Sequence, residues 1–126
     1  MKRKEKQLGL LEETIAYYSE DVTRRCTIGK GCRYSGESFN KPHSDGCAIG
    51  RLLSPELRLI LDTKHKGDSA IGVWDALPKL IQRYGKKFLL DLQLLHDGHE
   101  YWNDKGLSER GEEIVLKIKK EHELIL

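Results

Sequence analysis

Apolar residues recur in this chain at the three- to four-residue spacing that is typical of amphipathic helices. In the segment Gln7–Ser19, Leu11, Ile15 and Tyr18 share one helical face, and acidic residues lie on the opposite face. We therefore expect a short helix there. Residues 1–6 are mostly basic and have no apolar stripe, so we expect them to form a flexible N-terminus.

Helix-start and helix-stop residues predict two further helices. Ser54 is a capping serine, and the proline and glutamate that follow it suit the first turn of a helix. We expect this helix to reach about Leu61. The stretch Asp75–Pro78 then opens another helix, which Gly85 is placed to close. Between these two helices, Lys64–Ser69 is polar and is predicted to be a loop.

Two more helices are predicted in the C-terminal part of the chain. Phe88, Leu92 and Leu95 form the apolar stripe of the first, which ends near Asp97–Gly98. The second begins at Ser108, a capping residue. Its predicted buried face consists of Ile114, Val115, Ile118 and Ile125.

One segment shows short β-prone runs in place of helical spacing. Thr23–Ile28 and Cys32–Tyr34 are separated by Gly29–Gly31, which predicts a small β-hairpin with a glycine turn. Ser35–Gly46 is rich in turn residues and is predicted to be a loop. The predicted fold class is therefore α+β and predominantly helical, with about five helices and one small β-hairpin. We expect residues 1–126 to form a single compact domain, because this length suits one hydrophobic core.

Charge and composition narrow the function classes only slightly. The 22 basic and 20 acidic residues are interspersed, so no one-signed surface is predicted and nucleic-acid binding is unsupported. No run approaches the roughly 20 apolar residues that span a bilayer, and no apolar signal-peptide segment follows the basic start. We therefore expect a cytoplasmic protein with no membrane partner, whose three cysteines are reduced thiols.

The cysteines and one histidine fall in a single segment that could bind a metal. A structural zinc site there would use Cys26, Cys32, His43 and Cys47. Five, ten and three residues separate successive members of this set, whereas structural zinc sites usually pair ligands about two to four residues apart. The spacing therefore favours buried thiols that pack as small hydrophobic side chains. A zinc-stabilised interaction module stays an alternative.

Cys47 is also a candidate nucleophile. It lies at a glycine-flanked turn, Gly46–Gly50, and nearby cations such as Arg24, Arg25 and Arg51 would favour its thiolate form. The general base that such a thiol needs would be His43, His96 or His99. The alternative is that the small residues allow tight packing, with Cys47 facing the core, and burial statistics favour this alternative.

The adjacent pair His96 and Asp97, followed by His99, is a second catalytic candidate. It is similar to the doublet of HD-type metal-dependent phosphohydrolases, which need a further histidine and a further aspartate on other helices. His43 and His65 lie in predicted loops, not on such helices. An imidazole near the negative end of a helix, followed by a turn-forming Asp97–Gly98, explains the pair more simply.

Arginine and aromatic residues suggest a ligand site. Guanidinium groups bind phosphate or carboxylate and aromatic faces stack on bases, so their combination suits a small anionic or nucleotide-like ligand. The candidate ligand-binding residues are Arg24, Arg25, Tyr34, Arg51, His96 and Trp102. The alternative is that the tryptophan anchors the core and the arginines form a solvated face. Several of the arginines share one irregular segment, and irregular segments commonly carry binding sites.

Three short motifs occur in order along the middle of the chain. They are Cys32-Arg33-Tyr34, Gly46-Cys47-Ala48-Ile49-Gly50 leading to Leu53-Ser54-Pro55-Glu56, and Leu92-Gln93-Leu94-Leu95-His96-Asp97 followed by Trp102. With these motifs, roughly residues 20–103 resemble a group of small uncharacterised proteins of bacteria and their phages. The resemblance implies a phage or mobile-element accessory protein, and it carries over no established activity. The pattern includes Cys47, Arg51, His96 and Asp97.

The leading hypothesis is a non-enzymatic binding protein of phage or mobile-element type, which holds a small anionic or nucleotide-like ligand or a host protein. The alternative is a cysteine- or histidine-dependent hydrolase of a small or nucleotide substrate, with Cys47, His96 and Asp97 as its catalytic residues. No cofactor is expected except the zinc of the third alternative, the interaction module. A homo-oligomer is compatible with each of these hypotheses.

Overall fold

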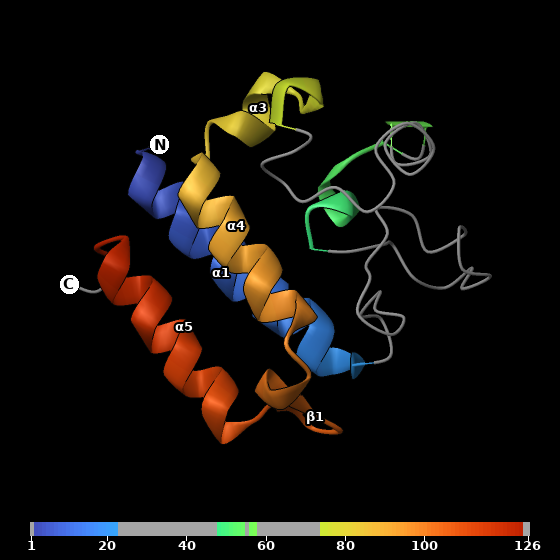
Figure 1. Cartoon of the computed structure of the whole chain (residues 1–126), viewed down its shortest axis with the longest axis vertical. Helices are drawn as coiled ribbons and strands as arrows, with labels where there is room; N and C mark the ends of the chain where they lie inside the picture. The colour runs from blue at the N-terminus through green and yellow to red at the C-terminus, as the bar shows by residue number, and fades with distance from the viewer. Residues whose placement is uncertain (1, 23–47, 55, 58–73, 125–126) are drawn as a thin grey trace.

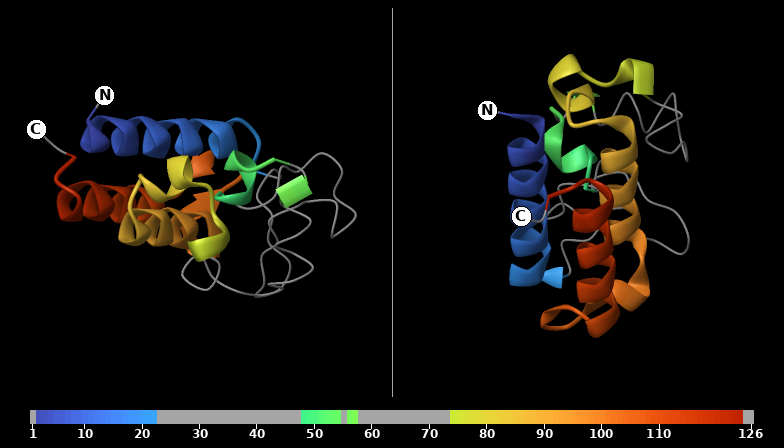
Figure 2. Two further views of the ribbon diagram at one scale, coloured as in Figure 1. Left: turned by 90° about the horizontal axis from the view of Figure 1, so that it is seen from above. Right: turned by 90° about the vertical axis from the view of Figure 1, so that its left-hand side faces the viewer.

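Three long helices lie side by side and contain more than half of the residues that the structure describes (Figure 1, Figure 2). They are α1 (Arg3–Glu20), α4 (Lys86–Asp97) and α5 (Glu109–Glu121). The computed structural model of the chain describes residues 2–22, 48–54, 56–57 and 74–124. The hairpin predicted within residues 23–34 and the loops predicted at Ser35–Gly46 and Lys64–Ser69 lie outside the described residues.

The first helix begins four residues earlier than the apolar pattern predicts, at Arg3 instead of Gln7. Its first turn therefore includes most of the segment that we expected to be a flexible N-terminus. A tertiary contact accompanies this extension, because Lys4 Nζ pairs with Glu123 Oε2 at 2.5 Å beyond the end of α5. Such a contact between distant parts of the chain leaves no local signal in the sequence.

One face of α1 is buried, and its residues follow helical spacing. They are Gln7, Leu10, Leu11, Thr14 and Tyr18. The predicted positions Leu11 and Tyr18 are both completely buried, whereas Ile15 is partly buried at the edge of the core. The apolar stripe of α1 is thus where the sequence predicts it, and two polar residues share the same face.

Gly85 separates α4 from a short helix, α3 (Lys79–Gln82). Its backbone φ is +96°, a left-handed value that favours glycine, so the predicted helix stop is confirmed. The helix that the sequence predicts from Asp75 begins only at Lys79. The residue before a proline is disfavoured in the α region, and Pro78 accordingly separates α3 from a single 3-10 turn, η4 (Trp74–Ala76).

Local capping groups fix three other predicted helix ends, whereas the helix end predicted near Leu61 lies outside the described residues. The backbone N–H of Gly98 bonds back to the last turn of α4. The hydroxyl of Ser108 accepts a hydrogen bond from the backbone N–H of Gly111 at 3.1 Å and caps α5. In the same way, Ser54 Oγ accepts a hydrogen bond from the backbone N–H of Leu57 at 3.2 Å. The predicted cap residues Ser54 and Ser108 are thus both confirmed.

A two-stranded antiparallel sheet connects α4 to α5 along the chain. Strand β1 (Trp102–Asn103) follows a 3-10 turn, η5 (His99–Tyr101), and pairs with β2 (Gly106–Leu107). In the turn, Asn103 Oδ1 accepts a hydrogen bond from the backbone N–H of Lys105 at 2.8 Å. Gly106 has a backbone φ of +125°, which a residue with a side chain rarely adopts. The sequence pattern does not predict this hairpin, because its strands are too short to show alternation.

The long helices and the segment 48–54 bury one apolar cluster. Its members are Leu10, Leu11, Tyr18, Ala48, Ile49, Leu53, Leu77, Phe88, Leu89, Leu92, Leu95, Trp102, Val115, Ile118 and Leu124. The predicted stripe of α4 lies within this core, and so do Val115 and Ile118 of α5. Among the described residues the fold is mostly helical with four α-helices and one small sheet, so the helix-rich α+β class is confirmed. No helix in this part of the chain is both long and apolar enough to span a lipid bilayer.

Candidate functional site

His96, in the last turn of α4, is completely buried and contacts Asp97. Its Nδ1 lies 2.7 Å from Asp97 Oδ1, and Gln93 Nε2 donates a hydrogen bond to the same carboxylate oxygen at 2.9 Å. Because a carboxylate accepts and does not donate, this contact places a proton on Nδ1. Asp97 itself is partly exposed. The pair has the geometry in which a carboxylate orients an imidazole for acid–base chemistry.

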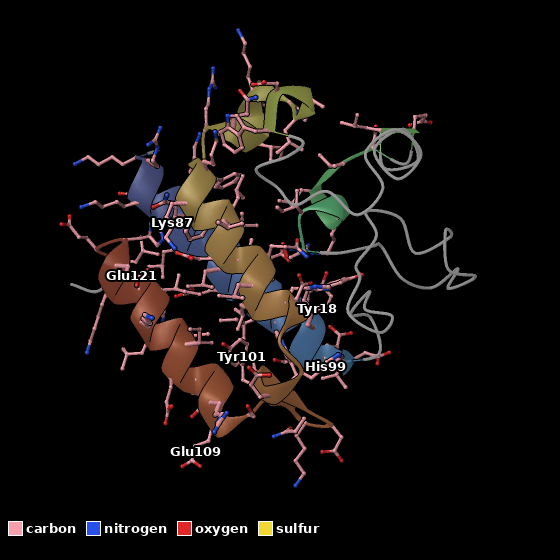
Figure 3. All side chains as sticks on the ribbon, viewed as in Figure 1. Tyr18, Lys87, His99, Tyr101, Glu109 and Glu121 are labelled. Atoms are coloured by element: carbon pink, nitrogen blue, oxygen red, sulfur yellow. The ribbon has the colours of Figure 1, made fainter. Side chains whose placement is uncertain are left out.

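Aromatic rings surround this histidine. The ring of Tyr18 on α1 lies edge-on to His96 at 5.1 Å and edge-on to Trp102 at 6.0 Å between ring centres. Trp102 Nε1 donates a hydrogen bond to the backbone carbonyl of Leu95 at 2.7 Å, and only 7% of the residue is exposed. The tryptophan is therefore part of the core. In Figure 3, Tyr18 is labelled near the C-terminal end of α4.

Arg51 joins the segment 48–54 to α1. It lies in a 3-10 turn, η3 (Gly50–Leu52), and its Nη1 pairs with Glu13 Oε2 at 2.8 Å. Its Nη2 donates a hydrogen bond to Thr14 Oγ1 at 3.1 Å, and its guanidinium lies over the ring of Tyr17 at 4.7 Å. The positive charge of Arg51 is thus balanced within the protein, so its visible role is to hold this segment against α1.

The segment 48–54 also contacts α4. The backbone N–H of Ile49 donates to Gln93 Oε1 at 3.4 Å, and Gln93 is the residue whose amide nitrogen bonds to Asp97. Ala48 and Ile49 are both completely buried. One glutamine therefore links the His96–Asp97 pair to the residues that directly follow Cys47 in the sequence.

The structure gathers the described members of the predicted site around the C-terminal half of α1. Arg51 contacts Tyr17, and Tyr18, the next residue, contacts both His96 and Trp102. His99 is exposed and lies in η5 (His99–Tyr101). The other predicted site residues lie outside the described residues: Arg24, Arg25, Cys26, Cys32, Tyr34, His43 and Cys47. The predicted ligand and zinc sites that depend on them stay predictions.

A pocket that the sequence pattern does not indicate lies between α1 and α3. Its volume is about 470 Å³, and its walls include the apolar side chains of Leu10, Leu80 and Tyr84. Lys6 and Arg83 bring positive charge to it, and its lining also includes Gly9, Ile81 and the acidic Glu5. The amide of Gln7 donates a hydrogen bond to the backbone carbonyl of Tyr84 at 2.5 Å and fixes the two walls together.

The pocket left no signal in the sequence because its two walls come from segments that are distant along the chain. No known protein family, curated protein or solved structure matches this chain. The geometry of the α1–α3 pocket and of the His96–Asp97 pair is therefore what supports a functional proposal.

Proposed function

We propose that this chain is a non-enzymatic binding protein that holds a small anionic, nucleotide-like ligand in the pocket between α1 and α3. The observation that carries the proposal is the combination of apolar walls with two basic side chains that form no ion pair with any described residue. Small-molecule sites are typically concave, mostly apolar and furnished with a few polar groups, with volumes of about 300–1,000 Å³. The α1–α3 pocket, at about 470 Å³, falls within that range.

The charges in the pocket favour an anion. Neither Lys6 nor Arg83 forms an ion pair within the described part of the chain. Arg83 and Lys6 together outweigh the single carboxylate of Glu5, which leaves one net positive charge in the lining. A guanidinium can bind phosphate or carboxylate through two parallel hydrogen bonds, so Arg83 is the main proposed contact.

The apolar part of the pocket favours a ligand with a flat, partly apolar group. Leu80 is 67% exposed, which is high for a leucine, and a bound ligand would cover it. Tyr84 offers an aromatic ring on which a base can stack. This proposal keeps the class of ligand that the sequence suggests but moves the site, because the charge of Arg51 is already balanced by Glu13.

We expect nucleoside monophosphates or diphosphates to raise the melting temperature of the protein, since a ligand that binds only the folded state stabilises it. Substituting Arg83→Gln is expected to weaken binding about 10- to 100-fold, because hydrogen bonds to a charged group contribute about 1.5–3 kcal/mol. Lys6→Gln should weaken it to a smaller extent. Thermal-shift titration with each nucleotide, and with inorganic phosphate as the minimal anion, measures the effect.

Arg110→Gln, which alters an exposed arginine on α5, is the matched control and should leave binding unchanged. An unchanged response in both Arg83→Gln and Lys6→Gln would refute the pocket. If only Arg24→Gln abolishes binding, the ligand binds in the segment from Arg24 to Arg51 and not in the α1–α3 pocket. Absence of any nucleotide or phosphate response would leave a host protein as the partner to seek.

The His96–Asp97 pair favours a second candidate function, a cysteine-dependent hydrolase of a small or nucleotide substrate. The pair orients an imidazole, and Gln93 ties it to the residues that follow Cys47. If Cys47 is the nucleophile, iodoacetamide at neutral pH should modify it roughly 10- to 20-fold faster than Cys26 or Cys32, because a thiolate-favouring environment raises its reactivity.

Peptide mapping by mass spectrometry after timed alkylation gives the three rates. Asp97→Asn should slow modification of Cys47 without changing the rates at the other two cysteines. Uniformly slow alkylation of all three thiols would argue against the hydrolase and leave the binding function as the better proposal.

A further inference from the structure

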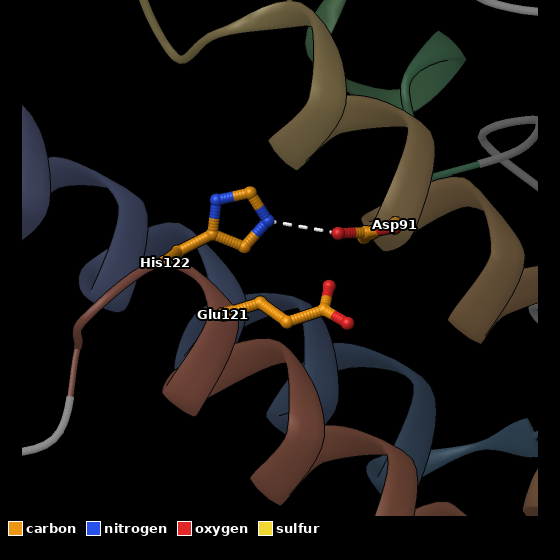
Figure 4. A group of neighbouring side chains, drawn as sticks. All are labelled: Asp91, Glu121 and His122. Atoms are coloured by element: carbon orange, nitrogen blue, oxygen red, sulfur yellow. Dashed lines mark hydrogen bonds and ion pairs between the residues drawn. The ribbon is translucent and has the colours of Figure 1, made fainter.

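We infer that Asp91, Glu121 and His122 form a binding site for one divalent transition-metal ion, with zinc as the best-suited ion. One donor atom from each side chain lies within 4.8 Å of the others. Figure 4 shows the two residues at the end of α5 reaching toward Asp91 on α4. The site is separate from both sites described above, and it joins two helices that are distant in the sequence.

The donor atoms are already close to the spacing that a metal requires. His122 Nε2 lies 2.8 Å from Asp91 Oδ2. Two ligands on one tetrahedral zinc ion, each about 2.0–2.2 Å from the metal, are about 3.4 Å apart. If these two atoms moved apart by less than about 1 Å, both could therefore bind one ion. Glu121 is exposed, so its flexible side chain can approach as the third ligand.

The surroundings of the site favour a bound cation. The side chains of Asp91 and His122 are only 8% and 13% exposed. The ring of Phe88 lies edge-on to His122 at 5.3 Å and forms an apolar wall. Charges attract more strongly next to such a wall than in water. The carboxylates of Asp91 and Glu121 and the imidazole of His122 therefore form a negatively charged, partly desolvated cluster. Solvent reaches this cluster at the exposed Glu121.

The donor set distinguishes among metals. Imidazole nitrogen suits zinc and its first-row neighbours, whereas magnesium and calcium prefer sites made only of oxygen. Three protein ligands leave one tetrahedral position for water, an arrangement common in zinc proteins. Because the ligands come from α4 and the end of α5, the bound ion would fasten these helices together.

Lys87 competes with the metal. Its Nζ lies 2.8 Å from Asp91 Oδ1, the carboxylate oxygen that does not contact His122. A lysine is positively charged at neutral pH, so this contact is also an ion pair with the Asp91 carboxylate. A metal cation bound at Asp91 Oδ2 would lie close to the ammonium group of Lys87, which contacts the other oxygen of the same carboxylate. The two positive charges would repel each other. Removing the lysine charge should therefore tighten metal binding.

The direct test is titration of the full-length chain, stripped with a chelator and dialysed, with Zn²⁺ alone. We expect one zinc ion per chain by calorimetry and a melting temperature roughly 5–10 °C higher at about a hundredfold excess over Kd. Glu121→Gln, on the exposed side of the site, should fold normally and weaken zinc binding at least about tenfold. His122→Gln should abolish it, and Lys87→Gln should strengthen it severalfold.

Glu113→Gln is the matched control, because it removes an exposed carboxylate from the same helix. It should leave zinc binding unchanged. Equal zinc affinity in Glu121→Gln, Glu113→Gln and the unaltered chain would overturn the inference. Failure of the unaltered chain to bind zinc at micromolar concentration would overturn it as well.

Cobalt(II) separates this site from a cysteine site. Thiolate ligands produce an intense sulfur-to-cobalt charge-transfer absorption, which nitrogen and oxygen ligands do not produce. We expect only the weak visible bands of a nitrogen–oxygen site. An intense thiolate band that is unaffected by His122→Gln would assign the metal to Cys26, Cys32 and Cys47 and would overturn the inference.

Discussion

Replacing Gly111 by alanine is expected to destabilise the fold by about 1–3 kcal/mol, even though alanine favours helices. A Cβ atom at this position would lie 2.1 Å from the backbone oxygen of Tyr101 and 2.8 Å from Leu107 Cδ2. The first of these is a backbone atom, so it cannot move away cheaply. Gly111 thus allows the close approach of α5 to the turn before the hairpin.

The matched control is Gly9→Ala on α1, where a Cβ atom would have no neighbour within 4 Å among the described residues. That change should stabilise the protein by about 0.5–1 kcal/mol, because alanine loses less backbone entropy in a helix. Urea unfolding of the two variants measures both effects. The same sign of change in both would contradict the close packing described for Gly111.

The second large effect is expected from Trp102→Ala, which should cost about 3–5 kcal/mol. The substitution removes a buried ring that packs against Tyr18, and it leaves the carbonyl of Leu95 without its donor. Trp102→Phe keeps most of the ring but not the N–H donor, so it should cost about 1–3 kcal/mol.

Thermal and urea unfolding of the two tryptophan variants give the comparison. Losses below about 1 kcal/mol in both would show that Trp102 is not a core anchor. If Trp102 contacts a ligand instead, its removal should lower ligand affinity while leaving the unfolding midpoint unchanged. The two outcomes therefore separate a structural role from a binding role.

Predictions from the sequence were most accurate for features that depend on residues close together along the chain. Ser108 and Gly98 mark helix ends through groups only a few residues away, so both could be found in the sequence alone. The apolar stripe of α4 depends on spacing within one helix and was equally visible. The early start of α1 was not visible, because it involves Lys4 and Glu123, which are 119 residues apart.

The candidate sites show the same difference between contacts of neighbouring residues and contacts of residues far apart along the chain. His96 and Asp97 are adjacent in the sequence, and their contact could be anticipated. The cluster of Asp91 with His122 could not, because a carboxylate inside an apolar stripe and a histidine near the chain end give no joint spacing signal. Likewise, no local pattern indicates that Glu13 balances the charge of Arg51. Such pairs become visible only when the helices are packed.

The contact between Lys4 and Glu123 also bears on how the chain could be rearranged. Their hydrogen bond and mutual attraction lower the pKa of Glu123, although both groups are too exposed for the pair to add much stability. What the pair does reveal is that the two ends of the described fold are neighbours. A short linker could join them at little entropic cost, and the exposed turn at Asp104–Lys105 offers a place for new ends. A circular permutation at this turn would therefore change the order of the helices along the chain and keep α1, α4 and α5 packed together.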